Sequence, residues 1–327
     1  MTSSSSLDAI VDPLRSLREQ FLLLTEPHRP ALWRYCLHLT GSPWDAEDLV
    51  QDTLLRAFAR LGHFWQPIDN PRAYLFRIAS NTWIDTLRRG KVQLDALDDA
   101  MGVAGEESAA TGLEVSEALM QLATLLPPRQ RTVLLLVDVF DFTAREVAAM
   151  LGATEGAVRA ALHRARTTLA RARALQQDAG VASAASLNGR ANTVLTRFVE
   201  AFNRRDADAI VALLDDDAST EIIGIADEHG REVIAEQSLR EGMASPLPQR
   251  AELGTLAGEP IVAIFAQLPG QPESLQWMIR LGIVGERICT WKAYFFTPDL
   301  IQYAADALGV PAMAMGYRYV APEPAAG

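Results

Sequence analysis

The sequence has few cysteines and no long apolar run. Its two cysteines, Cys36 and Cys289, lie far apart and match no metal-ligand spacing, which argues against a disulfide framework or a zinc site. No apolar run reaches the roughly 18 residues that a membrane helix requires. The opening letters, MTSSSSLDAI, lack the basic and apolar parts of a secretion signal. We therefore expect a cytoplasmic protein with no membrane partner, no metal and no cofactor.

Positive charge is also scarce, and it is unevenly placed. The net charge is −11, and the stretch from Val92 to Pro128 contains no Lys or Arg. A protein that coats nucleic acid indiscriminately needs Lys and Arg to displace counterions from phosphates. Arginines instead gather in one later segment, at Arg159, Arg164, Arg166, Arg171 and Arg173. Any nucleic-acid site must therefore be local.

The length of 327 residues suits roughly two or three domains. Apolar spacing near 3.6 predicts three helices between Pro30 and Arg89, and the helical period returns between Leu113 and Ala172. Acidic and Ala/Gly-rich stretches separate these segments, as in linkers. The predicted parts are an N-terminal segment with a lead helix (1–27), a helical domain (28–91), an acidic linker (92–112), a second helical domain (113–173), a linker (174–190), an α+β domain (191–312) and a tail (313–327).

The second helical domain contains the pattern of a helix-turn-helix, in FTAREVAAMLGATEGAVRAALHRARTTL. Thr143 can cap a first helix that runs to Leu151, Gly152 permits a left-handed turn, and Thr154 can cap a second helix. The apolar side of that second helix consists of Val158, Leu162, Ala165 and Leu169. The opposite side is polar and basic, with Glu155, Arg159, His163 and Arg166.

A basic outward face after a capped turn favours the binding of duplex DNA. Residues near the start of a recognition helix reach base edges, and nearby arginines hold phosphates. Arg159 is the best candidate for a base contact. The alternative is a surface helix whose arginines are only solvated, but the two caps and the short turn favour DNA. The motif by itself fits both a repressor and an initiation factor.

The first helical domain has one acidic helix, SPWDAEDLVQDTLLRAFARL, with Asp45, Asp48 and Asp52 on one side. Its other side is apolar and should be buried: Ala46, Leu49, Val50, Thr53, Leu54 and Ala57. In the next helix, NPRAYLFRIASNTWIDTLRRG, basic and aromatic residues interleave. Such a surface suits single-stranded DNA, whose bases stack on aromatic rings. The alternative is that aromatics such as Phe76 and Trp83 belong to the core.

These segments, together with LPPRQRTVLLL, resemble extracytoplasmic-function (ECF) sigma factors in four motifs that occur in the same order. The resemblance covers Pro30 to Ala172 and implies two mobile all-α domains, a partner in core RNA polymerase, and promoter DNA as the target. It places Asp48, Gln51, Asp52 and Arg56 against the clamp helices of the β′ subunit. The resemblance implies minus-ten contacts by Arg72, Tyr74, Arg77, Asn81, Trp83 and Arg88, and minus-thirty-five contacts by Thr154, Glu155, Arg159, His163, Arg164 and Arg166.

The C-terminal third changes class. Val194, Leu195, Phe198, Val199 and Phe202 share one helix face, Asp206 can cap a short second helix, ADAIVALL, and strand-like runs rich in β-branched and aromatic residues follow. This stretch resembles SnoaL-like members of the NTF2-like superfamily, which implies an α+β, cone-shaped domain. Candidate acid-base residues there are Glu221, Asp227, His229 and Trp277, but no spacing fixes a catalytic pair. We expect no enzyme activity and no catalytic residues.

The leading hypothesis is a sigma factor that binds polymerase core and whose activity is tuned by intramolecular contact with its own C-terminal domain. One alternative is a helix-turn-helix regulator that does not act through polymerase core. Another is a DNA-binding module fused to a SnoaL-type enzyme. The hypotheses differ in partners, so binding to core separates the first two.

Overall fold

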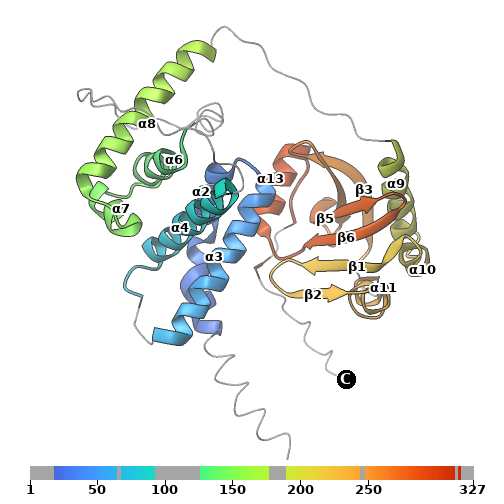
Figure 1. Ribbon diagram of the computed structural model, residues 1–327. Helices are drawn as coiled ribbons and strands as arrows, with labels where there is room; N and C mark the ends of the chain where they lie inside the picture. The colour runs from blue at the N-terminus through green and yellow to red at the C-terminus, as the bar shows by residue number, and fades with distance from the viewer. Residues whose placement is uncertain are drawn as a thin grey trace, which may run out of the picture. The chain divides into compact units, whose positions relative to one another are not determined.

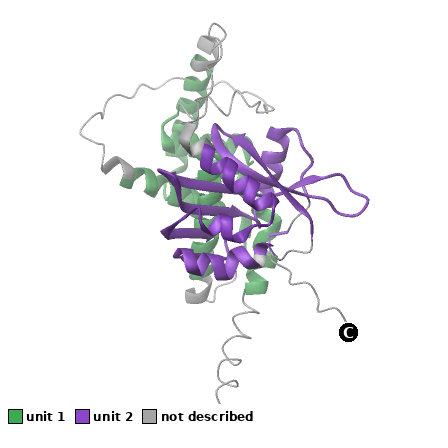
Figure 2. Ribbon diagram, turned by 90° about the vertical axis from the view of Figure 1, so that its right-hand side faces the viewer, with its two compact units in different colours: residues 1–180 green, residues 181–327 purple. Residues whose placement is uncertain are grey.

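The computed structural model describes residues 18–64, 68–92, 126–176, 189–243, 247–313 and 316–317. The chain divides into two compact units, residues 1–180 and 181–327 (Figure 2). Most of the two predicted linkers, and most of the N-terminal segment and tail, lie outside the described residues. The predicted domain boundaries therefore remain predictions.

In the first unit, residues 18–25 are helical, and the three predicted helices follow (Figure 1). A short 3-10 turn, η1 (Glu26–His28), leads into α2 (Arg29–Thr40), which is followed by α3 (Pro43–Phe64) and α4 (Pro71–Val92). Gly41 ends α2 in the left-handed conformation with φ 77°, which suits a residue without Cβ. Asn70 accepts a hydrogen bond from the Ala73 amide at the start of α4. Gly41 and Asn70 thus mark the breaks between the three helices of this domain.

The second group of helices in this unit consists of α6 (Pro128–Leu134), the π-helical segment η2 (Leu135–Val139), α7 (Ala144–Leu151) and α8 (Glu155–Gln176). Asp141 follows η2 with a positive φ of 56°. Such a conformation is uncommon outside Gly, Asn and Asp. It turns the chain between η2 and α7.

The apolar faces predicted for α3 and α8 are buried. The six α3 residues and the four α8 residues predicted to face inward are each at most 8% exposed. The predicted inner face of α9 (Gly189–Asn203) is likewise buried, apart from Val199, which is partly buried. Helical periodicity was therefore sufficient to orient these helices toward their cores.

The second unit combines helices with one six-stranded sheet in the order β2-β1-β6-β5-β4-β3 (Figure 1). The strands are β1 (Leu214–Ile222), β2 (Ala226–His229), β3 (Gln249–Leu256), β4 (Glu259–Ala266), β5 (Ser274–Val284) and β6 (Arg287–Tyr294). Only β1 and β6 pair in parallel; the other neighbours are antiparallel. The remaining helices are α10 (Ala207–Val211), α11 (Arg231–Ile234), the π-helical η3 (Ala235–Leu239), α12 (Arg240–Met243) and α13 (Pro298–Leu308).

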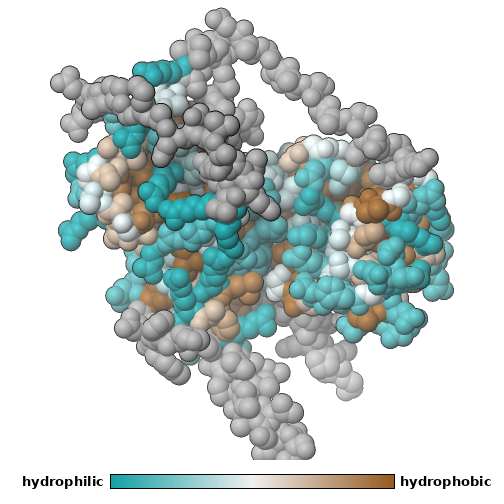
Figure 3. Space-filling view, viewed as in Figure 1, coloured by the Kyte–Doolittle hydropathy of each residue, from teal (hydrophilic) through white to brown (hydrophobic). Residues whose placement is uncertain are grey.

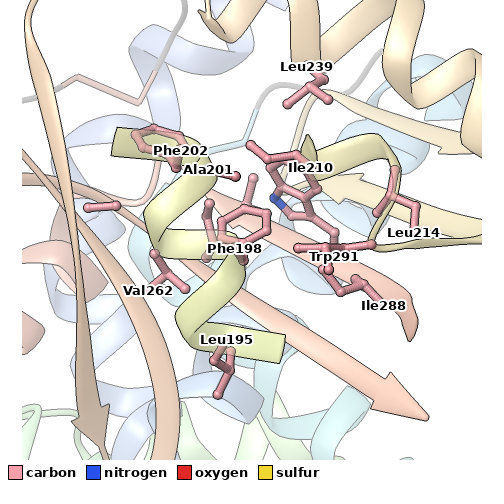
Figure 4. Packing of buried hydrophobic residues seen from close by; sticks show 14 of the residues in the cluster. Leu195, Phe198, Ala201, Phe202, Ile210, Leu214, Leu239, Val262, Ile288 and Trp291 are labelled. Atoms are coloured by element: carbon pink, nitrogen blue, oxygen red, sulfur yellow. The ribbon is translucent and has the colours of Figure 1, made fainter. Parts of the chain in front are cut away.

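One face of this sheet packs on α9. Figure 4 shows Leu195, Phe198 and Phe202 of α9 turned toward strand residues such as Val262 and Trp291. Phe198 and Trp291 meet edge to face, with ring centroids 5.3 Å apart. β4 is buried from Ile261 to Ala266 on both of its faces. This explains why its sequence is continuously apolar and does not alternate between apolar and polar residues.

The fold class predicted from sequence is confirmed: two groups of helices precede an α+β unit with a mixed sheet. Two details differ. The helix capped by Asp206 ends at Val211, because Leu214 already begins β1. The sequence also gave no signal for β3, whose residues QRAELGTL are poor in β-branched and aromatic side chains. β3 pairs with β4 along its whole length. This pairing holds β3 as a strand although its residues have little intrinsic preference for one.

None of the described helices is both long enough and apolar enough to pass through a membrane. Among the residues coloured in Figure 3, hydrophilic ones predominate on the face shown. Among the described residues, the large hydrophobic side chains that are exposed are Leu23, Leu55, Ile225, Val233 and Val284. Single exposed apolar residues are ordinary in globular proteins.

Candidate nucleic-acid and polymerase interfaces

The helix-turn-helix is formed by α7 and α8, and its caps are those that the sequence predicts. The Thr143 hydroxyl accepts from the Glu146 amide at 3.2 Å, while Glu146 Oε2 accepts from the Thr143 amide at 2.8 Å. These reciprocal bonds are a capping box. Gly152 is left-handed with φ 61°, and Thr154 Oγ1 accepts from the Ala157 amide. The turn between the two helices is therefore fixed at both ends.

The outward face of α8 is charged, as predicted. Arg159 and Arg164 are exposed, and His163 and Glu155 are partly exposed. Arg159 Nη2 lies 2.7 Å from Glu155 Oε1, one turn earlier. An exposed ion pair of this kind is worth well under 1 kcal/mol, so the Arg159 side chain can exchange Glu155 for another acceptor at low cost.

Arg166 differs from the other arginines of α8. Its guanidinium binds Asp138 of η2 through two bonds, of 3.0 and 2.7 Å. The pKa of Arg166 is raised, and hydrogen bonding to the Asp138 side chain is the largest cause. A bidentate pair of this kind fixes geometry as well as charge. Arg166 thus joins α8 to η2, and the sequence alone placed it only on the DNA-facing side.

The residues predicted for the minus-ten contact are all on α4, in unequal environments. Asn81 and Arg88 are exposed, and Arg88 pairs with Asp85 at 3.5 Å. Tyr74 and Arg77 are partly exposed and contact each other, with the guanidinium 5.4 Å from the ring centroid. Trp83 is buried at 7% exposure.

Arg72 is also engaged within the protein. Its Nη2 donates to the carbonyl oxygen of Phe140, and its guanidinium lies 4.4 Å from the ring centroid of Phe142. Both phenylalanines follow η2 in the second group of helices. Arg72 therefore contacts the second helical domain in this structure.

The residues predicted to face polymerase lie on successive turns of α3. Asp48 and Asp52 are exposed, and Asp52 pairs with Arg56 at 3.7 Å. Arg56 also donates to Thr82 Oγ1 of α4 at 3.0 Å, while Gln51 donates to Glu47 at 2.7 Å. The two carboxylates thus remain on the surface, and Asp52 is one of the partners of Arg56.

The acid-base candidates of the C-terminal unit do not gather in its core. Glu221 pairs with Lys292 at 2.8 Å, and Asp227 and His229 are exposed. Trp277 is buried and stacks on Phe295 at 3.7 Å between ring centroids. Within the described residues, no group of three or more His, Cys, Asp or Glu side chains could hold a metal ion.

The buried carboxylate of this unit is Glu228, which sequence reasoning missed. It is 7% exposed and accepts from the Ser238 hydroxyl at 2.7 Å. It pairs across the sheet with Thr220, which in turn pairs with Trp291. β2 is short, and Glu228 lies between Asp227 and His229. The sequence therefore did not distinguish Glu228 from its polar neighbours. Only the strand register turns Glu228 inward.

Comparison with known proteins agrees with this arrangement. Residues 24–92 match the family model for Sigma-70 region 2, and residues 116–169 match that for Sigma-70 region 4. The chain is 34% identical to the ECF RNA polymerase sigma factor SigG of Mycobacterium tuberculosis (strain H37Rv) over 238 residues, covering 64% of this chain and 63% of the relative. It is 33% identical to the ECF RNA polymerase sigma factor EcfG of Rhodopseudomonas palustris (strain TIE-1) over 156 residues, covering 47% of this chain and 83% of the relative.

The fold and the two matched regions define a protein that contains regions 2 and 4 of the sigma-70 class. More narrowly, the chain belongs to the ECF RNA polymerase sigma factors. It spans 63% of the length of the SigG relatives that it matches. Among solved structures, an NTF2-like protein of unknown function from Cytophaga hutchinsonii is similar at 10% identity, with a TM-score of 0.25, covering 34% of this chain and 92% of that one.

Proposed function

We propose that this protein binds core RNA polymerase in the cytoplasm and directs it to promoters. The observation that carries the proposal is the capped pair α7 and α8, which presents an exposed basic face in a chain of the ECF sigma family. In this proposal Arg159 and Arg164 bind at the minus-thirty-five element, together with Thr154, Glu155 and His163. Arg166 has a supporting role there, because Asp138 holds its guanidinium.

The polymerase contact is proposed on α3. Asp48 and Asp52 supply an exposed acidic surface that is complementary to a basic one, and we assign this surface to the clamp helices of β′. Gln51 and Arg56 complete the surface, and the Arg56 bond to Thr82 supports it from α4.

The minus-ten element is proposed to bind along α4. Asn81 and Arg88 are exposed, and Tyr74 with Arg77 offers a ring beside a cation, which suits an unstacked base and its phosphate. Arg72 and Trp83 complete this set once their contacts within the protein, to Phe140, Phe142 and Arg131, are released.

Core binding tests the proposal directly. The full chain should capture purified core polymerase, and the Asp48→Ala/Asp52→Ala variant should capture less of it. Glu200→Ala, an exposed acid on α9, is the control that should bind as the wild type does. Sequencing transcripts after overexpression then supplies a promoter for transcription with core. Absence of binding by the wild-type chain to core would favour a regulator that acts without polymerase.

We propose a regulatory and not a catalytic role for the C-terminal unit, through intramolecular contact with the sigma domains. Support comes from the placement of its acid-base candidates: Glu221 is paired with Lys292, and Asp227 and His229 are exposed. A general acid or base in an apolar site needs burial to shift its pKa toward neutrality. None of these three residues is buried.

A further inference from the structure

A row of buried side chains crosses the sheet of the C-terminal unit. Glu228 of β2 lies opposite Thr220 of β1, and Thr220 lies opposite Trp291 of β6. Residues that pair directly across strands point to the same face of a sheet. Phe198 of α9 meets Trp291 edge to face on that side (Figure 4). The three side chains are therefore neighbours on the face of the sheet that α9 covers.

Two polar groups in this row have hydrogen-bonding capacity that the protein leaves unused. Thr220 is 2% exposed, and its Oγ1 is buried with no hydrogen-bond partner among the described residues. Buried hydroxyls without a partner are costly and therefore few in proteins. The Glu228 carboxylate, also buried, accepts from the Ser238 hydroxyl of η3. An ionised carboxylate can accept about four such bonds, so one hydroxyl does not satisfy it.

The charge around Glu228 favours a cation. Residues 214–239, which include β1, β2, α11 and η3, contain eight Asp or Glu residues and one Arg. That arginine, Arg231, pairs with Asp216. Glu228 itself forms no ion pair within the described part of the chain. A buried carboxylate is stabilised by a cation, and a segment with this excess of acids attracts cations and repels anions.

Glu228 is also close to the protein surface. β2 is an edge strand of the sheet, and Asp227 and His229, on either side of Glu228, are exposed. Ser238, which donates to Glu228, is partly exposed. A small ligand therefore has only a short distance to travel from solvent, between the sheet edge and η3, to reach the carboxylate.

We infer that Glu228, Thr220 and Trp291 form a binding site for a small organic cation, an ammonium group that carries a short apolar substituent. The ammonium group has three donors and no acceptor, and it donates to the Glu228 carboxylate and the Thr220 hydroxyl. The substituent lies against the Trp291 ring, which attracts cations as well as apolar groups. All three residues belong to the C-terminal unit, so the inference goes beyond the proposed function and does not depend on it.

Calorimetric titration of the full chain with phenethylammonium tests the site. The matched probes are 3-phenylpropionate and 2-phenylethanol, which carry the same ring on a similar chain but end in a negative or a neutral group. We expect the ammonium to bind at a single site, and the other two probes to bind at least about tenfold more weakly, the effect of a hydrogen bond to a charged group. Absence of ammonium binding at millimolar concentration, or equal binding of all three probes, would overturn the inference.

Glu228→Gln distinguishes this site from general attraction by an acidic protein. The variant keeps the size of the side chain and removes its charge, so ammonium binding should weaken by about tenfold or more. Glu221→Gln is the matched control, because Glu221 is next to Thr220 on β1, points to the opposite face and pairs with Lys292. The control should bind as the wild type does. Equal affinity of Glu228→Gln and wild type would contradict the site.

Thr220→Val keeps the test decisive if Glu228→Gln fails to fold. The valine has nearly the shape of threonine and removes the hydroxyl that lacks a partner. We expect a higher melting temperature for the ligand-free protein and about fivefold weaker ammonium binding. A lower melting temperature, or an unchanged affinity, would remove Thr220 and with it the proposed site. None of these measurements involves polymerase or promoter DNA, so their failure and the failure of the proposed function are distinguishable.

Discussion

At the scale of single residues, His38 makes the stability of the folded protein sensitive to pH. It lies on α2, with its ring 6.3 Å from that of Phe140, and burial, with a smaller effect of Arg34, lowers its pKa from 6.5 to about 4. The folded protein therefore keeps His38 neutral where the unfolded chain takes up a proton. Stability from this residue is complete above pH 6.5 and is lost as the pH falls toward 4.

We expect the free energy of unfolding to fall by about 2 kcal/mol between pH 6.5 and 4 on account of His38. Urea unfolding of wild type and His38→Gln at several pH values measures this loss. The variant should show a flatter pH dependence in that window, and His229→Gln, at an exposed position, should follow the wild type. Equal slopes for His38→Gln and wild type would contradict the assignment.

The cap of α7 is a second feature that one residue controls. Thr143→Ala removes the hydroxyl that accepts from the Glu146 amide, and with it half of the capping box. Helix caps of this type contribute about 1 kcal/mol, so we expect that loss in urea unfolding, with weaker binding to the minus-thirty-five duplex. Thr168→Ala, at an exposed position inside α8, is the control. A loss no larger than that of the control would show that the cap does not set the stability of α7.

At the scale of elements, α8 combines two kinds of arginine. Arg159 is 67% exposed in its side chain and pairs only locally with Glu155, whereas Arg166 is bound to η2 through Asp138. The first arrangement leaves a side chain ready to contact DNA, and the second holds the helix in place. Arginines on the same face of α8 therefore lie in different environments.

Arg159→Ala should weaken binding to the specific duplex by about 1 to 3 kcal/mol and relax the preference at one base pair. Fluorescence anisotropy with a set of single-base duplex variants measures both effects. Arg171→Ala, exposed near the other end of α8, should produce only a small loss that is alike for every sequence. Uniform weakening by Arg159→Ala would reassign Arg159 to a phosphate contact.

At the scale of the whole molecule, the sheet-containing unit follows the sigma domains along the same chain. A regulator covalently joined to its target acts at an effective concentration set by the joining segment and does not depend on expression of a second protein. Under the proposed regulatory role, we expect the output of the sigma domains to depend on the C-terminal unit.

Truncation after Gln176 should leave binding to polymerase core intact and change transcription from the promoter. The matched control is truncation after Tyr317, which keeps α13 and the sheet. Pull-down with core and transcription in vitro provide the two readouts. Unchanged output after removal of the whole unit would remove the autoregulatory claim, and loss of core binding would show that the unit belongs to the polymerase interface.

The sequence by itself determined the local features of this protein. The caps at Thr143, Thr154 and Asp206, the turn at Gly152, and the buried faces of α3, α8 and α9 all follow from residues within one or two helical turns. Such signals need no information from distant parts of the chain, which is why they could be predicted.

The tertiary structure alone decided the contacts between distant elements. The bonds of Arg131 to Leu39, of Arg72 to Phe140 and of Arg166 to Asp138 join residues 92, 68 and 28 positions apart, and the inward turn of Glu228 depends on strand register. Each is set by how separate elements pack, and one-dimensional periodicity carries no record of which faces meet. For that reason the sequence identified the candidate DNA-binding residues, and only the packed structure revealed that two of them are held by the protein itself.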